Sequence, residues 1–261
     1  MADISAAEPK PALGVGAIVS ESFSILFGNF FKVIITAFVP TLIGFLISGI
    51  LIGFGPALGV QEPQFDSVFS ILANILSPLI DMVIYSITTA LLIQLAYDAK
   101  LNRPISIGRY FGPALSSIAP LAILSIVATF LAALGFVFFV VPGIWIYGVF
   151  AVMAPAVVIE RAGFGGLGRS ARLTKEYRWP IIGAFLLALV CAVLINVVSL
   201  LVVGLITGIG GVVGMVISVI IFAGLSAIGA GLISIVTSLI YARLREIKEG
   251  VSVDQIAAVF D

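Results

Sequence analysis

The chain has 261 residues, of which 61% are hydrophobic and 10% are charged, and it contains no histidine and one cysteine. A water-soluble domain needs about 25% charged residues to cover its surface, so this composition excludes an ordinary soluble globule. It also excludes a disordered chain, a disulfide-stabilised fold and a Cys/His zinc site, because the residue types that these need are missing. An integral membrane protein remains.

Six continuous apolar runs predict an all-α integral membrane fold with six transmembrane helices, since barrel strands would alternate with a period of two. The predicted spans are, in chain order, about 33–54, 79–97, 117–141, 144–159, 181–206 and 212–241. They form a membrane domain over residues 14–246. A disordered cytoplasmic tail over 1–13 precedes it, and a short cytoplasmic helix over 247–261, with a capping box at 252–255, follows it.

The basic residues indicate the orientation of these spans. Lysine and arginine occur before the first span, between the second and third, between the fourth and fifth, and after the sixth. The other three connections contain none. Short basic loops are retained in the cytoplasm, so the sequence predicts that both termini are inside.

Amphipathic segments precede three of the spans and are predicted to lie along the cytoplasmic membrane surface. In the first, apolar residues recur at spacings of three and four from residue 15 to residue 30. Comparable segments cover 106–121 and 167–177. We therefore predict three repeats of one surface helix plus two spans, starting near residues 14, 105 and 165.

The most charged stretch of the chain precedes the fifth span and contains Arg169, Arg172, Lys175 and Arg178. The simple interpretation is that these residues set the orientation and lie on a solvated face. The sharper hypothesis is that they contact anionic lipid headgroups, each contributing about 1 kcal/mol near the membrane surface. Trp179 would then be the interface anchor that fixes the depth of the helix.

Pairs of glycines four residues apart predict close packing between spans, because glycine lets two backbones approach. The alternative is that glycine is simply common in membrane helices. The glycines of these pairs are Gly49, Gly53, Gly204, Gly208, Gly210 and Gly214.

Asp81 is the only acid inside a predicted span, and an ionisable residue within the membrane is a functional hypothesis by default. Asp98 marks the inner boundary of that span and lies about 26 Å away along a helix that rises ~1.5 Å per residue. This places Asp81 near the outer interface. There it would be hydrated or would cap the helix that starts after Pro78; ion or proton coupling is the alternative.

No catalytic, metal or cofactor site is expected. Without histidine the chain has no imidazole base, no Ser–His pair and no histidine metal ligand. Residues 163–168 match the Gly-x-Gly-x-x-Gly pattern of dinucleotide sites. Such a site needs a strand on either side, whereas a membrane helix follows here, so we interpret this segment as a flexible cytoplasmic turn.

Four short motifs in the second half of the chain belong together: residues 142–145, 155–160, 168–175 and 241–245. Over roughly 142–245 they resemble the membrane domain of bacterial glycerophosphoryl diester phosphodiesterases and of related stand-alone bacterial membrane proteins. In those enzymes catalysis belongs to a separate soluble barrel that uses histidine, carboxylates and a metal. The chain lacks this barrel, so the resemblance implies a bacterial cytoplasmic (inner) membrane protein that acts as an anchor or scaffold.

Our first functional prediction is a non-enzymatic membrane scaffold or lipid-interacting domain. Its partners would be membrane lipids and a protein partner or second copy, with no nucleic acid. A transporter or exporter of a small amphiphile is the first alternative. An intramembrane enzyme is the second, and it would require Asp81, Asn196 and Ser199 to converge. A polar cavity at mid-membrane would favour transport, and a purely apolar interior would favour the scaffold.

Overall fold

A computed structural model describes residues 11–100, 103–207 and 211–250, and helices account for most of them. This described part contains no strand, which confirms the all-α prediction. In chain order the elements are α1 (Val15–Gly28), α2 (Phe30–Ile52), α3 (Phe54–Ala57), α4 (Val68–Lys100), α5 (Ile107–Phe138), α6 (Val140–Phe150), α7 (Met153–Ile159), the 3-10 turn η1 (Gly163–Gly165), α8 (Gly166–Leu173), α9 (Arg178–Thr207) and α10 (Gly211–Glu249).

Six helical stretches of the described chain are long and apolar enough to cross a membrane, as the six apolar runs predict. They are α2, α4, α5, the pair α6 and α7, α9 and α10. Several extend beyond the predicted span, because backbone hydrogen bonding continues past the apolar stretch. In particular, α4 begins at Val68 instead of residue 79 and contains Pro78 in its interior. The chain is a multi-pass membrane protein.

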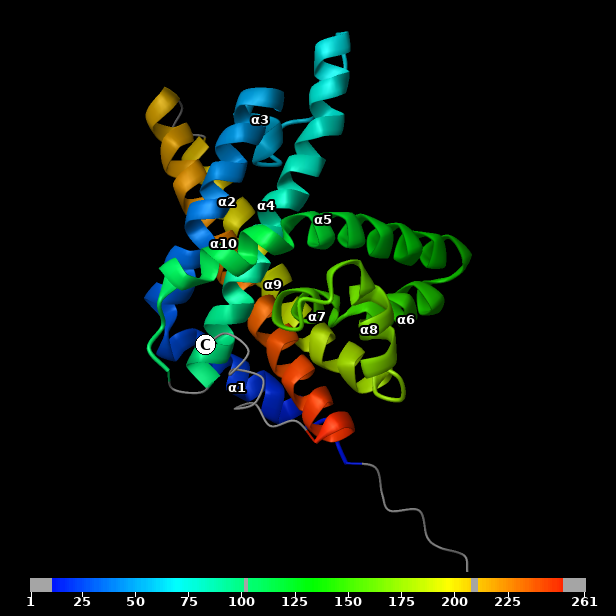
Figure 1. The fold of residues 1–261 in the computed structure, drawn as a ribbon. Coiled ribbons are helices and arrows are strands. Elements are labelled where there is room, and N and C mark those ends of the chain that lie inside the picture. Colours follow the sequence, from blue (N-terminus) through cyan, green and yellow to red (C-terminus); the bar gives the residue numbers. More distant parts are fainter. Residues whose placement is uncertain (1–10, 101–102, 208–210, 251–261) are drawn as a thin grey trace, which may run out of the picture.

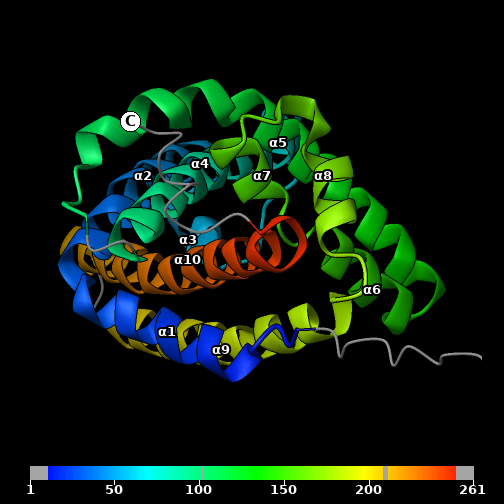
Figure 2. The same ribbon diagram turned by 60° about the horizontal axis from the view of Figure 1, so that its bottom comes forward.

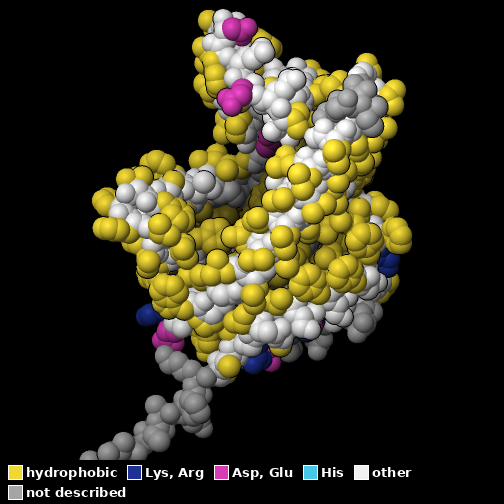
Figure 3. All heavy atoms as spheres, turned by 180° about the vertical axis from the view of Figure 1, so that it is seen from behind, with side chains coloured by type: hydrophobic (Ala, Val, Ile, Leu, Met, Phe, Trp, Pro, Cys, Tyr) yellow, Lys and Arg dark blue, Asp and Glu magenta, His cyan; other side chains and the backbone are white. Residues whose placement is uncertain are grey.

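Four long helices, α2, α4, α9 and α10, form the body of the molecule (Figure 1). Helix α1 lies against α9 and α10 at one end of this body (Figure 2). We call this end basal, and we call the opposite end, where α3 lies, distal. The described lysines and arginines all lie at basal helix ends or in the connections between them. On the face drawn in Figure 3 they accordingly occur in its lower part.

Helices α5 and α6 form a hairpin that projects from the side of the body, with α5 running across it (Figure 1). Phe139 alone joins the two helices and has an extended backbone, so the break comes earlier than the predicted break at residues 142–143. Gly143 instead lets α6 pack closely on α5, because a Cβ added at Gly135 would lie only 2.9 Å from the Cα atom of Gly143. The side chain of Phe139 at the tip is 76% exposed and has exposed apolar neighbours on both sides, as expected for a surface that contacts lipid and not water.

The packed core lies toward the basal end. Leu92 and Ile93 of α4 and Ile235 and Ile240 of α10 are completely buried there. The Tyr97 hydroxyl donates a 3.1 Å hydrogen bond to the backbone carbonyl of Ser238, which joins α4 to α10. By contrast, the distal parts of α4 and α9 carry many exposed apolar side chains, as expected for surfaces that face lipid.

The three predicted surface segments differ in structure. The first is the separate helix α1, which ends at Asn29. The second, over 106–121, is continuous with the third predicted span in α5, although that helix contains Pro113 and Pro120. The third is the short helix α8. The threefold repeat stays a prediction, and these segments show different lengths and different connections to the following span.

Both ends of the predicted membrane domain continue into neighbouring segments. Leu13, within the predicted tail, is buried, and the Pro11 carbonyl accepts a 3.0 Å hydrogen bond from the Tyr177 hydroxyl. Helix α10 extends through Glu249, so the first residues of the predicted C-terminal helix belong to it. Residues 1–10 of the tail and 251–261 of that predicted helix lie outside the described residues.

We predict that Gly135→Ala destabilises the protein by about 2 kcal/mol, because the added methyl group overpacks the contact between α5 and α6. Gly204→Ala is the matched control, since no atom lies within 4 Å of a Cβ at that position. Alanine is favoured over glycine in helices, so the control is expected to be neutral or to gain up to about 1 kcal/mol. Thermal denaturation in detergent micelles measures both. Equal midpoints for the two variants would contradict the proposed close packing of the hairpin.

Candidate functional site

Arg169 of the predicted basic cluster lies in an ion network at the basal end. Its Nε and Nη2 atoms donate to the two carboxylate oxygens of Glu160, each at 2.6 Å, and Nη2 lies 2.5 Å from Oε1 of Glu249. The hydrogen bonds to Glu160 hold the pKa of the Arg169 guanidinium above its ordinary value. Arg169 therefore already has two carboxylate partners within the protein.

Two further residues of α10 complete what we call the Glu160 network, formed by Glu160, Arg169, Tyr241, Arg245 and Glu249. Arg245 Nε lies 2.8 Å from Oε2 of Glu249 and 3.5 Å from Oε1 of Glu160. The Tyr241 hydroxyl donates to Glu160. The charged side chains are only 15–26% exposed. The network therefore joins the end of α7 to α8 and α10.

The amino-acid sequence by itself did not indicate that these five residues form one network. Its signal was nevertheless present, because all of its members except Glu249 belong to three of the motifs that carry the family resemblance. These motifs are far apart in the chain, and the order of residues alone does not show that Glu160 faces Tyr241 and Arg245. Only the packing of α7, α8 and α10 brings them together.

The other members of the basic cluster lie in different surroundings. Arg172 and Lys175 are exposed, and their backbone carbonyls accept hydrogen bonds from Lys248 Nζ at 3.3 and 2.7 Å. The Arg178 guanidinium lies 4.1 Å from the centre of the Trp145 ring. Trp179 is 60% exposed at the basal end of α9. Contact with anionic lipid stays a prediction, and Arg172 and Lys175 are the cluster members with exposed side chains.

The glycines of the predicted pairs have several different roles. A Cβ at Gly214 would lie 3.0 Å from the backbone oxygen of Ile206, so α9 and α10 approach closely there. A Cβ at Gly49 would overlap the Phe54 ring, and Gly53 adopts a positive φ of 91° in the following turn. Gly204 has open space around it. Gly208 and Gly210 lie outside the described residues.

Residues 163–168, which match the dinucleotide pattern, form the turn η1 and the beginning of α8. A Cβ at Gly166 would lie 2.5 Å from a methyl group of Val157, so this glycine lets α8 pack on α7. No strand precedes the segment in the described chain, which agrees with our interpretation of it as a turn.

Asp81 lies in the interior of α4, and not at the start of that helix as predicted. The expectation assumed that the helix begins after Pro78, whereas about 20 Å of helix, at ~1.5 Å per residue, lies on the distal side of Asp81. The predicted span began directly after Pro78, whereas this proline is accommodated within α4. The Ser48 hydroxyl of α2 donates a 2.8 Å hydrogen bond to Oδ1 of Asp81.

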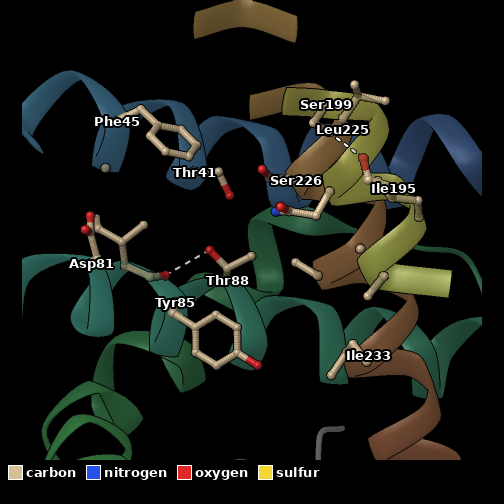
Figure 4. A pocket seen from close by; sticks show the side chains of 16 residues that line it. Thr41, Phe45, Asp81, Tyr85, Thr88, Ile195, Ser199, Leu225, Ser226 and Ile233 are labelled. Carbon is tan, nitrogen blue, oxygen red and sulfur yellow. Dashed lines mark hydrogen bonds between the residues drawn. The ribbon is translucent and has the colours of Figure 1, made fainter. Parts of the chain in front are cut away.

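A central cavity of about 480 Å³ lies between α2, α4, α9 and α10 (Figure 4). Its polar lining residues are Thr41, Asp81, Tyr85, Thr88, Asn196, Ser199 and Ser226. Asp81, Asn196 and Ser199 thus line one cavity, although their positions in the sequence did not indicate this. In Figure 4 Asp81 lies at one end of the cavity and Ser199 lies at the other.

Asp81 also lines two further cavities. A lateral cavity of about 690 Å³ separates α4 from the α5–α6 hairpin and contains Tyr85 and Tyr147. A distal cavity of about 600 Å³ reaches from Asp81 past Asn74 to Pro63 and Phe65 in the loop before α4. The surface view shows a deep hollow between the projecting hairpin and the distal part of the body (Figure 3). Asp81 is therefore the one ionisable carboxylate that all three cavities share.

Two hydroxyl groups of the central cavity donate to carbonyl groups of their own helices. The Ser199 hydroxyl donates to the backbone oxygen of Ile195 at 2.7 Å, and Thr88 donates to that of Ile84 at 2.8 Å. A nucleophilic serine would instead donate to a base. Among the described residues no group of three His, Cys, Asp or Glu side chains could hold a metal ion. The cavity walls thus offer oxygen acceptors and the Asn196 amide beside apolar surface.

No family model, curated protein or solved structure matches the chain. The resemblance over residues 142–245 therefore stays a prediction, and the function must be argued from the residues themselves.

We predict that Glu160→Gln lowers the free energy of unfolding by roughly 3 kcal/mol, because it leaves two largely buried arginines with one carboxylate between them. Glu246→Gln is the matched control: Glu246 also pairs with an arginine, Arg243, but both side chains are exposed. An exposed pair is worth less than about 1 kcal/mol. Thermal denaturation of the purified protein in one detergent compares the two. A Glu160→Gln midpoint equal to that of Glu246→Gln would show that the network does not hold the basal end together.

Proposed function

We propose that this multi-pass membrane protein binds a small amphiphilic molecule in the cavities around Asp81 and carries it across the membrane. The observation that supports this most directly is the group of polar side chains in the otherwise apolar lining of the central cavity within the four-helix body. A purely structural membrane domain has no need for a carboxylate and several hydroxyl groups around an open space. Membrane helices keep such groups where they contact a solute, an ion or water.

The distribution of packing also supports transport. The distal cavity extends from Asp81 to the distal loop, and the central cavity extends toward the basal end only as far as Thr88 and Ile233; beyond these residues lie the closely packed core and the Glu160 network. A binding site open toward one end and closed toward the other is what a carrier presents in one state of its cycle. The proposed cycle therefore requires the basal contacts between α7, α8 and α10 to open when the distal side closes.

The proposed location is the cytoplasmic membrane of a bacterium, with the basal end inside. The described basic residues at the basal end support this orientation, since positive loops are retained in the cytoplasm. Glu62 and Asp66, in the distal connection, are acids. With this orientation the distal cavity faces the outside. No enzymatic step is part of the proposal.

A lipid-interacting scaffold is the second candidate function. The exposed side chains of Arg172, Lys175 and Trp179 at the basal end favour it, because they combine positive charge with an interfacial aromatic ring. This candidate does not account for the polar cavity around Asp81. The two functions therefore make different predictions for changes within that cavity.

The orientation predicts how introduced cysteines react. In a Cys191→Ser background, which removes the only native cysteine, Asp66→Cys should react with a membrane-impermeant maleimide added to intact cells. Arg172→Cys, exposed at the basal end, should react only after the membrane is permeabilised. If position 172 is labelled in intact cells and position 66 is not, the orientation is the opposite of the one proposed.

Filling the central cavity tests transport directly. Gly229 lines this cavity, and a Cβ there would meet no atom within 4 Å, so Gly229→Leu projects into the open space without a clash at its first carbon. We expect this variant to slow transport about tenfold or more, because the side chain occupies the binding site. Gly224→Leu, on the same helix, outside the cavity lining and equally free of contacts, is the matched control and should transport normally.

The assay uses proteoliposomes with trace amounts of radiolabelled amphiphiles that share a dodecyl chain: dodecyltrimethylammonium, dodecyl maltoside and dodecyl sulfate. Protein-dependent movement from the inner to the outer leaflet is measured by extraction of the outer leaflet with cyclodextrin. The transport proposal predicts that at least one probe moves faster than in protein-free liposomes and that Gly229→Leu slows the movement of that probe. If all probes move at the protein-free rate, the transport proposal is wrong and the scaffold is favoured.

A further inference from the structure

Asp81 is an acid within a helix that is long and apolar enough to span a membrane, and it has no basic partner in the described part of the chain. Its hydrogen-bond partner there is the neutral Ser48 hydroxyl. None of the three cavities that it lines contains a lysine or arginine among its lining residues. A carboxylate in low-dielectric surroundings is costly unless a positive charge lies beside it. The protein itself supplies no such charge at this position, and the Asp81 side chain is exposed to the cavities, so it can accept a positive charge from a ligand.

Aromatic rings surround the space next to this carboxylate. Phe45 lies between the central and distal cavities, and Tyr85 between the central and lateral cavities. In the lateral cavity Tyr147 packs edge to face on Phe185, with ring centres 5.7 Å apart. Figure 4 shows Asp81, Phe45 and Tyr85 around the same part of the central cavity. The faces of aromatic rings attract organic cations, and most strongly where water is excluded.

The hydroxyl groups of the cavity add to this preference. Thr88 and Ser199 use their protons in hydrogen bonds to carbonyl groups of their own helices, so their oxygen lone pairs are what remain for a ligand. In the same way Thr237, in the lateral cavity, donates to Ile233 at 2.7 Å. Such oxygen dipoles stabilise positive charge. An anionic headgroup would need a basic side chain to balance its charge, and the linings contain none; the Asn196 amide and the Ser226 hydroxyl can donate hydrogen bonds but carry no charge.

We propose that the transported molecule is an amphiphilic organic cation whose charged headgroup binds against Asp81, Phe45 and Tyr85. This inference rests on the proposed transport function and specifies its substrate class. The apolar part of the ligand would occupy the lateral cavity, which is lined by α5, α6 and α10 in addition to α4. A bare metal ion is a poorer match, because a single carboxylate supplies too few of the oxygen ligands that hard cations need.

Equilibrium binding to the full-length protein in lipid nanodiscs tests the assignment, with empty nanodiscs of the same lipid as the blank. The probes are dodecyltrimethylammonium and dodecyl sulfate, which differ in headgroup charge but share their chain. We expect the wild type to bind the cation at least about tenfold more tightly than the anion. Asp81→Asn should weaken binding of the cation about tenfold or more, because one partner of a desolvated charge pair is lost. It should leave binding of the anion unchanged or tighter.

Matched variants separate charge from general disruption. Asp66→Asn makes the same acid-to-amide change in the distal loop, outside the linings of the three cavities, and should bind the cation like the wild type. Asp81→Glu keeps the negative charge and should retain binding of the cation within about threefold, since it preserves the pairing partner. If Asp81→Asn does not elute as a single folded species, the proposal is tested by the other two measurements: cation binding by Asp81→Glu, and the preference of the wild type for the cation over the anion.

Two results would overturn the assignment: unchanged binding of the cation by Asp81→Asn, or binding of dodecyl sulfate by the wild type as tightly as dodecyltrimethylammonium. These outcomes are distinct from a failure of the transport proposal. If Gly229→Leu blocks movement of dodecyl maltoside or dodecyl sulfate while Asp81→Asn has no effect, transport stands and the substrate is not a cation. If no probe binds or moves above the protein-free control, both proposals fail.

Discussion

The pairing of charge at the basal end is the interaction on which the rest of the structure depends. One carboxylate, Glu160 at the end of α7, is shared by Arg169 of α8 and by Tyr241 and Arg245 of α10. Glu249 accepts from both arginines and closes the network. Ions this far removed from water are stable only in the company of their partners. The elements that carry them are therefore held in one arrangement.

This arrangement divides the molecule into two halves with different properties. Toward the basal end, from Ala90 of α4 onward, α4 and α10 are closely packed, and Tyr97 and Tyr241 meet edge to face with ring centres 6.5 Å apart. On the distal side of this core the helices enclose the cavities, and their outer surfaces face lipid. The α5–α6 hairpin leans away from the body and leaves the lateral cavity beside α4. Asp81 lies in this hollow part, where it lines all three cavities.

The same division explains why Asp81 stands apart from the other acids in the body. At the basal end Glu21 pairs with Lys100, Asp98 with Arg109, and Glu160 with its network. The described basic side chains all lie at that end, so none of them lies beside Asp81. In the proposed function the substrate provides the missing positive charge. Binding and release of that charge would then be linked to opening of the basal contacts.

The amino-acid sequence by itself determined the class of the protein. Long apolar runs such as the one in α9 are compatible only with helices in a bilayer, because the hydrocarbon core requires every backbone group to be bonded within its own segment. The number of long helices follows from the same rule. Helix ends were less accurate, as at Val68, because hydropathy marks the lipid boundary whereas hydrogen bonding marks the end of the helix.

The candidate site was decided by tertiary structure alone. Asp81, Asn196 and Ser199 come from α4 and α9, and their common cavity depends on how these helices pack with α2 and α10. The Glu160 network likewise joins residues up to 89 positions apart in the chain. Hydrophobic periodicity specifies which residues avoid water, and it does so locally. Which polar groups then face one another is set by the rotation and crossing of packed helices, and no local pattern encodes that.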